Sequence, residues 1–189
     1  MRVVGTRPEL IKMSRVIAEF DQPTQHILVH TGQNYDYELN QIFFDDLQIR
    51  KPDYFLASAH DSTGAANTIG NLITLVDNVL LDEKPDAVLV LGDTNSCLSV
   101  IPAKRRKIPI FHMEAGLRAW DKRMPEQTNR RLIDHISDIL LPFNSYHREN
   151  LIKEDIHPSK IIISGNPTFE VLKAFEKQID NSNILVDLN

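Results

Sequence analysis

The chain has only one cysteine among its 189 residues, so Cys97 has no intrachain disulfide partner. A lone cysteine fits a reducing compartment, and we expect a cytoplasmic protein. No apolar run approaches the roughly 20 residues that a membrane-spanning helix needs, so no membrane partner is expected. No signal peptide is expected either, because Arg7, Glu9 and Lys12 interrupt the segment that would have to be apolar.

Positive charge is also scarce. The chain has 21 Lys and Arg against 26 Asp and Glu, which gives a net charge of -5. Its one basic cluster, residues 104–107, fits the end of a helix, where cations interact favourably with the helix dipole. Because nucleic-acid binding requires a face rich in Lys and Arg, no nucleic-acid partner is expected.

Three kinds of motif are missing. There is no G-x-G-x-x-G fingerprint, so a nicotinamide cofactor gains no support. No pair of His or Cys has the spacing of metal ligands, and no Ser lies in a G-x-S-x-G turn. The sequence therefore predicts neither a cofactor nor a metal.

The strongest positive signal is the alternation of short apolar runs with longer amphipathic runs. Consecutive apolar residues are typical of strands that are covered on both faces. The short runs predict strands at residues 2–6, 26–31, 86–92, 108–115, 138–143 and 160–165, with 52–58 as a weaker candidate. The longer runs predict helices at residues 8–20, 37–47, 62–83, 94–107, 125–136, 145–153 and 167–179, the fourth of which should bend or stop near Pro102. This order predicts an α/β fold with a doubly wound parallel sheet, Rossmann-like in kind.

The organisation along the chain indicates one Rossmann-like domain over residues 1–180. Residues 181–189 are polar and then briefly apolar. We interpret them as a linker toward a further domain that this chain does not contain.

In doubly wound sheets, ligands bind beyond the carboxyl ends of the strands. The first such loop contains Gly5 and Arg7, followed one turn later by Lys12. A glycine turn into a helix offers free N–H groups to an anion, and Arg7 adds a planar donor fork suited to phosphate. The alternative is that Arg7 only pairs with a surface carboxylate.

Carboxylates mark two later loops. Asp93 ends an apolar strand, where it is either a functional group or the N-cap of the next helix. Glu114 lies two residues after His112, so both side chains are expected on one face of their strand. Glu126 begins a helix in which Asn129 and Arg130 lie one turn later.

These carboxylates are expected to converge and to shift one another's pKa apart, which would provide a proton acceptor and a proton donor near neutral pH. A purely structural network of ion pairs remains the alternative.

Five segments in order carry a resemblance to a known family: GTRPELIK, TGQNYDYE, VLGDTNS, HMEAGLR followed by PEQTNR, and SGNPTFEVL. Together they resemble the non-hydrolysing UDP-N-acetylglucosamine 2-epimerases over residues 1–180. HTGQNYDYELNQIFF and LGDTNSCLSVIPAKRRKIPIFHMEAG further resemble the branch that forms UDP-N-acetyl-L-fucosamine for capsule and O-antigen polysaccharides.

The resemblance implies that the chain is the N-terminal half of a two-domain fold of the glycosyltransferase-B type. The active site would lie between the two domains, so this half alone is expected to be inactive and to need a second Rossmann-like domain. The resemblance also implies a UDP-sugar substrate and a homodimer.

The implied reaction eliminates UDP across C1–C2 and adds it back after protonation of the opposite face, without a redox cofactor or metal. By the matching motifs, Asp93, Glu114 and Glu126 are the acid–base carboxylates. The implied substrate-binding residues are Arg7, Lys12, Arg118, Asn129 and Arg130. Two positions depart from the usual pattern of the family: Asn34 stands where many members have His, and Gln127 replaces a second acid.

Two other functions stay open. One is a glycosyltransferase of the same fold class, which would need a separate acceptor. The other is a non-catalytic dimerising module, in which the long helix expected at residues 62–83 could supply the interface.

Overall fold

The computed structural model describes residues 1–32, 37–60, 62–121 and 123–184. Its centre is a parallel sheet of six strands in the order β3-β2-β1-β4-β5-β6. The strands are β1 (Arg2–Val4), β2 (Leu28–His30), β3 (Tyr54–Phe55), β4 (Val88–Leu91), β5 (Ile110–Met113) and β6 (Ile139–Leu141). The strand order reverses between β1 and β4, which makes the sheet doubly wound and confirms the Rossmann-like prediction.

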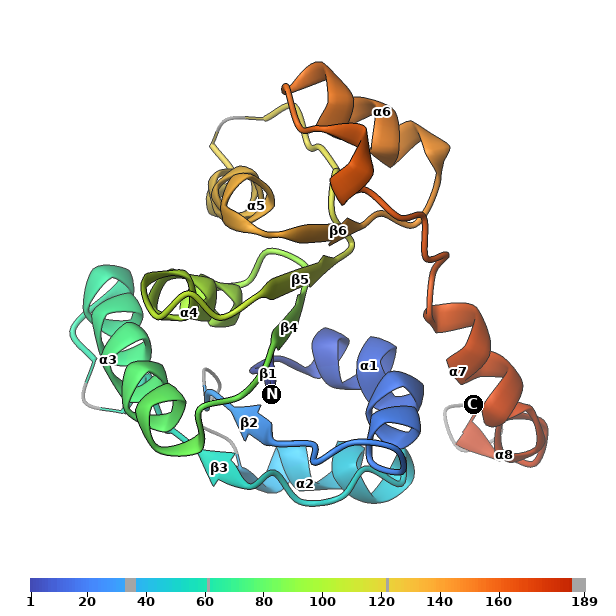
Figure 1. The fold of residues 1–189 in the computed structure, drawn as a ribbon. Coiled ribbons are helices and arrows are strands. Elements are labelled where there is room, and N and C mark those ends of the chain that lie inside the picture. The colour runs from blue at the N-terminus through green and yellow to red at the C-terminus, as the bar shows by residue number, and fades with distance from the viewer. Residues whose placement is uncertain (33–36, 61, 122, 185–189) are drawn as a thin grey trace.

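Helices cover both faces of this sheet (Figure 1). One face carries α1 (Arg7–Phe20) and α2 (Tyr37–Asp46), which enclose a core around Val4, Leu10 and Leu28. The other face carries α3 (Ala65–Glu83), α4 (Val100–Arg105) and α5 (Pro125–Ile136). Their core includes Leu72 and Val90. The remaining elements are the 3-10 turn η1 (Asn95–Ser99), α6 (Ser145–Lys153), the 3-10 turn η2 (Pro158–Lys160), α7 (Thr168–Ala174) and α8 (Glu176–Asp180).

The expected strand at residues 160–165 is wrong as a full strand. The segment runs beside β6, but it forms only one isolated parallel bridge, between Leu140 and Ile161. Ile162 and Ile163 are 56 % and 48 % exposed, so the apolar run there reflects the rim of the sheet rather than burial on both faces.

Two expected helices are divided. Residues 95–105 form η1 followed by α4, so the element changes type ahead of Pro102. Pro102 then lies in the first turn of α4, where a missing N–H group costs nothing. The helix expected at 167–179 breaks at Phe175 into α7 and α8. Among the described residues, no helix combines the length and apolarity that a membrane crossing requires.

Candidate active site

Two carboxylates meet on the guanidinium group of Arg130. Nη2 of Arg130 lies 2.6 Å from Oδ2 of Asp93 and 3.0 Å from Oε1 of Glu114. Nε donates to the same oxygen of Asp93 at 3.0 Å, and Nη1 donates to the backbone carbonyl of Glu114. The Arg130 side chain is only 3 % exposed, so this contact is nearly dry. The expectation that Asp93 and Glu114 lie close together agrees with this geometry.

The sheet places these two groups side by side because β4 and β5 are neighbours. Leu91 pairs with Met113, and Asp93 and Glu114 follow directly beyond those paired residues. Glu114 has a positive φ of 63°, a left-handed conformation that is rare outside glycine. Thr94, not Asp93, is the N-cap residue of η1. The alternative that Asp93 merely caps the next helix is therefore wrong.

Lys12 completes the polar cluster from α1. Its Nζ atom lies 2.5 Å from Oε2 of Glu114, so the two oxygens of Glu114 have different cationic partners. Burial alone would raise the pKa of Glu114, but the hydrogen bond from Lys12 and the charges of Arg130 and Lys12 outweigh it and lower the pKa. Glu114 is therefore ionised at neutral pH and can accept a proton.

Glu9 is a fourth carboxylate that the sequence analysis missed. It is 3 % exposed and accepts hydrogen bonds from the backbone N–H groups of Gly5 (2.6 Å) and Thr6 (3.1 Å) and from the Thr94 hydroxyl. Burial raises its pKa to about 7, despite these hydrogen bonds. The expected pair of shifted carboxylates therefore takes an unexpected form: the raised pKa belongs to Glu9, which ties the first loop to the Asp93 loop.

This arrangement also limits anion binding at the start of α1. The N–H groups of Gly5 and Thr6 were expected to be free, but Glu9 already occupies them. Arg7 is the first residue of α1 and its side chain is exposed, so it remains available at that helix end.

A second polar network lies behind the cluster and is structural. His112 is fully buried, with Nε2 donating to the Gly92 carbonyl at 2.7 Å and Nδ1 2.8 Å from Asp134. Arg118 bonds Asp134 at 2.8 Å and Glu154 at 2.6 Å, with a side chain that is 0 % exposed. The expectation that Arg118 faces a substrate is therefore not supported, because its guanidinium is enclosed by these two acids.

The other expected residues lie along α5. Asn129 donates from Nδ2 to the Asp93 carbonyl at 3.0 Å and to Asn95 at 3.1 Å, so it fixes the loop after β4. Glu126 lies one turn earlier, in the exposed first turn of α5. Helical spacing puts Glu126 on the side of Asn129 and Arg130, at the mouth of the cluster.

The expected second loop lies partly outside the described residues, because these exclude Gln33 and Asn34. In the part of the chain that the structure describes, no group of three or more His, Cys, Asp or Glu is arranged to hold a metal ion.

Carboxylates and cations gathered beyond the carboxyl ends of β4 and β5 define a class: a Rossmann-like domain with an acid–base site at its strand ends. Comparison with known proteins is more specific. The chain belongs to the UDP-N-acetylglucosamine 2-epimerase family, which it matches over residues 18–188.

Three relatives show the range of this similarity. A UDP-N-acetylglucosamine 2-epimerase structure from Rickettsia bellii is 58 % identical with a TM-score of 0.93, and the match covers 100 % of this chain and 50 % of that one. The Methanocaldococcus jannaschii UDP-GlcNAc 2-epimerase in complex with UDP-GlcNAc and UDP is 37 % identical with a TM-score of 0.86, covering 98 % and 51 %.

The third relative, the UDP-2,3-diacetamido-2,3-dideoxy-D-glucuronate 2-epimerase of Pseudomonas aeruginosa, is 45 % identical over 172 residues, covering 88 % of this chain and 48 % of its own. This chain thus spans about half the length of each of these relatives.

Proposed function

We propose that this chain supplies the N-terminal half of a UDP-N-acetylhexosamine 2-epimerase. The observation that carries the proposal is the sharing of Arg130 by Asp93 and Glu114, with Lys12 on the second oxygen of Glu114. Membership of the UDP-N-acetylglucosamine 2-epimerase family supports the substrate class. A carboxylate kept ionised beside a mobile ammonium group suits reversible proton transfer at carbon.

The proposed reaction begins with removal of the C2 proton of the sugar by Glu114. The C1–O bond breaks, its electron pair leaves with UDP, and a C1–C2 double bond forms. UDP oxygen then attacks C1 while a proton is delivered to C2 from the opposite face, which gives the epimer. Asp93 and Glu126 are the candidates for this opposite face.

Charge on the departing diphosphate needs cations nearby. Arg7, exposed at the first residue of α1, is our candidate for that role, and Lys12 can follow the charge as it moves. We expect further cations from a second Rossmann-like domain that closes over the site, and a homodimer as the working assembly. For the product we propose UDP-N-acetyl-L-fucosamine for capsule or O-antigen synthesis, on the motif resemblance alone.

Hydrogen exchange at C2 tests the activity. Residues 1–180 replace the matching half of the Rickettsia bellii relative, and the chimera is incubated with UDP-N-acetylglucosamine in deuterated water. We expect deuterium at C2, and none with this chain alone. A glycosyltransferase would leave C2 unlabelled without an acceptor, and so would a purely dimerising module.

Three variants of the chimera sharpen that test. Glu114→Gln and Asp93→Asn should each slow the exchange by about 10²–10⁴-fold, the usual contribution of a general acid or base. Glu149→Gln, which changes an exposed carboxylate of α6 in the same way, should leave the rate unchanged. Near-normal exchange in Glu114→Gln or Asp93→Asn removes that residue from the mechanism. Replacing the substrate by a UDP-linked 6-deoxy-L-talose-type amino sugar tests the proposed product.

A further inference from the structure

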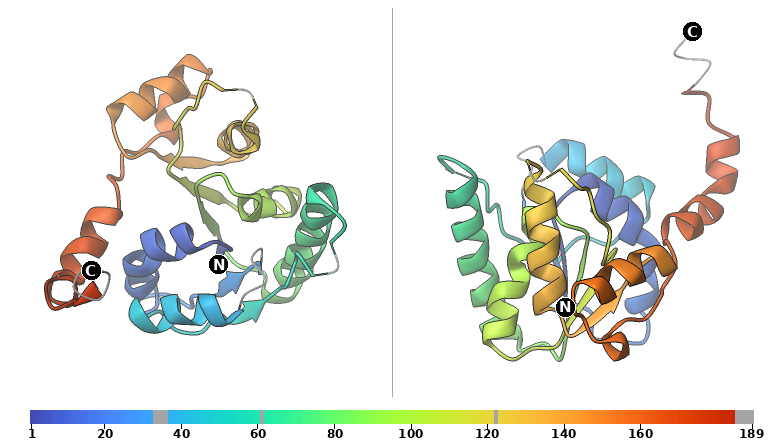
Figure 2. Two further views of the ribbon diagram at one scale, coloured as in Figure 1. Left: turned by 180° about the vertical axis from the view of Figure 1, so that it is seen from behind. Right: turned by 90° about the horizontal axis from the view of Figure 1, so that it is seen from above.

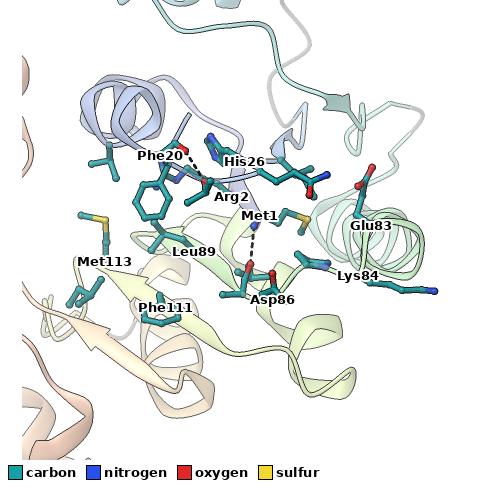
Figure 3. A pocket seen from close by; sticks show the side chains of 18 residues that line it. Met1, Arg2, Phe20, His26, Glu83, Lys84, Asp86, Leu89, Phe111 and Met113 are labelled. Atoms are coloured by element: carbon teal, nitrogen blue, oxygen red, sulfur yellow. Dashed lines mark hydrogen bonds between the residues drawn. The ribbon is translucent and has the colours of Figure 1, made fainter. Parts of the chain in front are cut away.

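A cavity of about 610 Å³ opens on the α1 face of the sheet, away from the Asp93–Glu114 cluster (Figure 3). Volumes of this size are typical of small-molecule sites. Most of its wall is apolar and comes from α1 and three adjacent strands: Val16, Phe20, Leu89, Phe111, Met113 and Leu141. An apolar wall alone says nothing about an occupant, but the polar groups at one end of this cavity do.

Arg2 lines this end and is only 1 % exposed. Its Nε and Nη1 atoms are buried without a hydrogen-bond partner among the described residues. Its guanidinium carbon lies 4.8 Å from the centroid of the Phe20 ring, which offers a face but no counter-charge. Burial lowers the pKa of Arg2 to about 9, so the group is still charged at neutral pH. A buried cation of this kind is costly unless an anion compensates it.

The nearest acid does not fill that role. Asp21 is already bound by Nε of Arg50 at 3.0 Å and by Nδ1 of His26 at 2.5 Å. His26 also lines the cavity, and its Nε2 atom is buried without a hydrogen-bond partner in the described part of the chain. Two side chains with unused nitrogen atoms therefore lie at the same end of an apolar cavity.

The layout of the strands sets the length of the apolar wall. Arg2 belongs to β1, and the wall continues over β4, β5 and β6, which are consecutive neighbours in the sheet. Strands lie about 4.8 Å apart, so the strip from Arg2 to Leu141 is roughly 14 Å long. This length matches an extended alkyl chain of roughly ten carbons that begins at Arg2.

We propose that this cavity binds a medium-chain carboxylate, with the carboxylate on Arg2 and His26 and the alkyl chain along the β4–β6 strip. The carboxylate supplies the two oxygens that a guanidinium fork accepts. The apolar chain removes the exposed faces of Leu89 and Phe111 from water. Because the cavity does not share residues with the candidate active site, this proposal stands independently of the proposed epimerase activity.

Methionine methyl groups provide the test, because the chain has only four methionines. Met113 lines the cavity and is 7 % exposed, whereas Met124 is 42 % exposed and lies in the loop before α5, outside the cavity. Decanoate is added to the 189-residue chain carrying 13C-methyl methionine. We expect a saturable shift of the Met113 signal with Met124 unchanged. Equal shifts at both methyls, or none at Met113, overturn the proposal.

Two comparisons test the role of charge. Arg2→Met should weaken decanoate binding by at least about tenfold, as expected when a buried charged partner is removed. Arg123→Met, the same change at an exposed arginine, should leave binding unchanged. Decan-1-ol, which lacks the anion, should bind the unaltered chain at least about tenfold more weakly than decanoate. Equal binding of acid and alcohol overturns the proposal.

Two further outcomes remain decisive. If Arg2→Met fails to fold, as judged by the signal of the core residue Met13, Arg2→Lys and the alcohol comparison carry the test, with weaker binding expected for both. If the Met113 signal moves with protein concentration in the absence of ligand, the cavity is covered by a second copy of the chain and the proposal is wrong.

Discussion

Two carboxylates share the single guanidinium of Arg130, so the loss of this side chain affects both. In Arg130→Met, Asp93 and Glu114 remain close together without their common cation. Breaking a buried ion pair on one side typically costs 3–5 kcal/mol, and we expect the free energy of unfolding to fall by about 3 kcal/mol. Urea unfolding at pH 7 measures it. Arg123→Met is the matched control, because Arg123 pairs with Asp121 at the surface and should change stability little.

Glu9 gives the stability of the chain an unusual dependence on pH. Its pKa is about 7 in the folded chain against an ordinary value of 4.5. Between these values the folded chain holds a proton that the unfolded chain has lost, so the free energy of unfolding decreases as the pH rises from about 4.5 to about 7. The decrease should be on the order of 3 kcal/mol.

The comparison of the unaltered chain with Glu9→Gln isolates this effect. Glutamine stays neutral throughout, so the stability difference between the two proteins should change across this pH window. Other acids, such as Glu114 and Asp134, have lowered pKa values and contribute in the opposite direction at lower pH, but equally in both proteins. Parallel curves for the two proteins would show that Glu9 titrates normally.

Among the elements, the turn from β1 into α1 depends on the absence of a side chain at Gly5. A Cβ atom there would lie 1.9 Å from Oγ of Ser96 and 2.1 Å from Oγ1 of Thr31. These hydroxyls bond each other at 2.8 Å in the core, so they cannot both move aside. We expect Gly5→Ala to lower the free energy of unfolding by about 2 kcal/mol.

Gly70 offers the opposite case, because a Cβ there meets nothing within 4 Å and the residue lies inside α3. Gly70→Ala should raise the free energy of unfolding by about 0.5–1 kcal/mol through helix propensity. Thermal or urea unfolding of both variants makes the comparison. A tolerated Gly5→Ala would mean that η1 shifts without cost.

The elements also explain which parts of the candidate site could be predicted from sequence. Asp93 and Glu114 follow apolar strands, and parallel neighbouring strands bring their carboxyl ends together, so their proximity was predictable. Arg118 was not, because the chain turns at Gly116, with a φ of 75°, before Arg118 reaches Glu154 near the end of α6. No local pattern specifies that direction.

Glu9 and the seventh strand show the same limit. Glu9 is the third residue of α1, where an acid ordinarily signals a capping box, and only the packing of the first loop against Thr94 buries it. Residues 160–165 have the apolar run of a strand, yet strand length depends on a covering layer that this edge of the sheet lacks.

For the whole molecule, burial is uneven along the chain. β4 and β5 lie in the middle of the sheet, and Val90 is fully buried. In contrast, α7 packs on α1 through the buried Val171, and α8 has no buried residue. Both helices extend beyond the α/β body (Figure 2, right). The expected domain over residues 1–180 thus contains a tightly packed part and a loosely attached end.

Hydrogen exchange followed by NMR should separate these two parts. Amides that open only with global unfolding are protected by the full free energy of unfolding, whereas helices with few buried contacts open locally at little cost. We expect the Val90 amide to be among the slowest to exchange and the α8 amides to exchange orders of magnitude faster, with α7 between them. The cooperative unit would then end before α7 rather than at residue 180. Equal protection of α8 and β4 would instead make α7 and α8 integral to the domain, held by contacts stronger than their burial indicates.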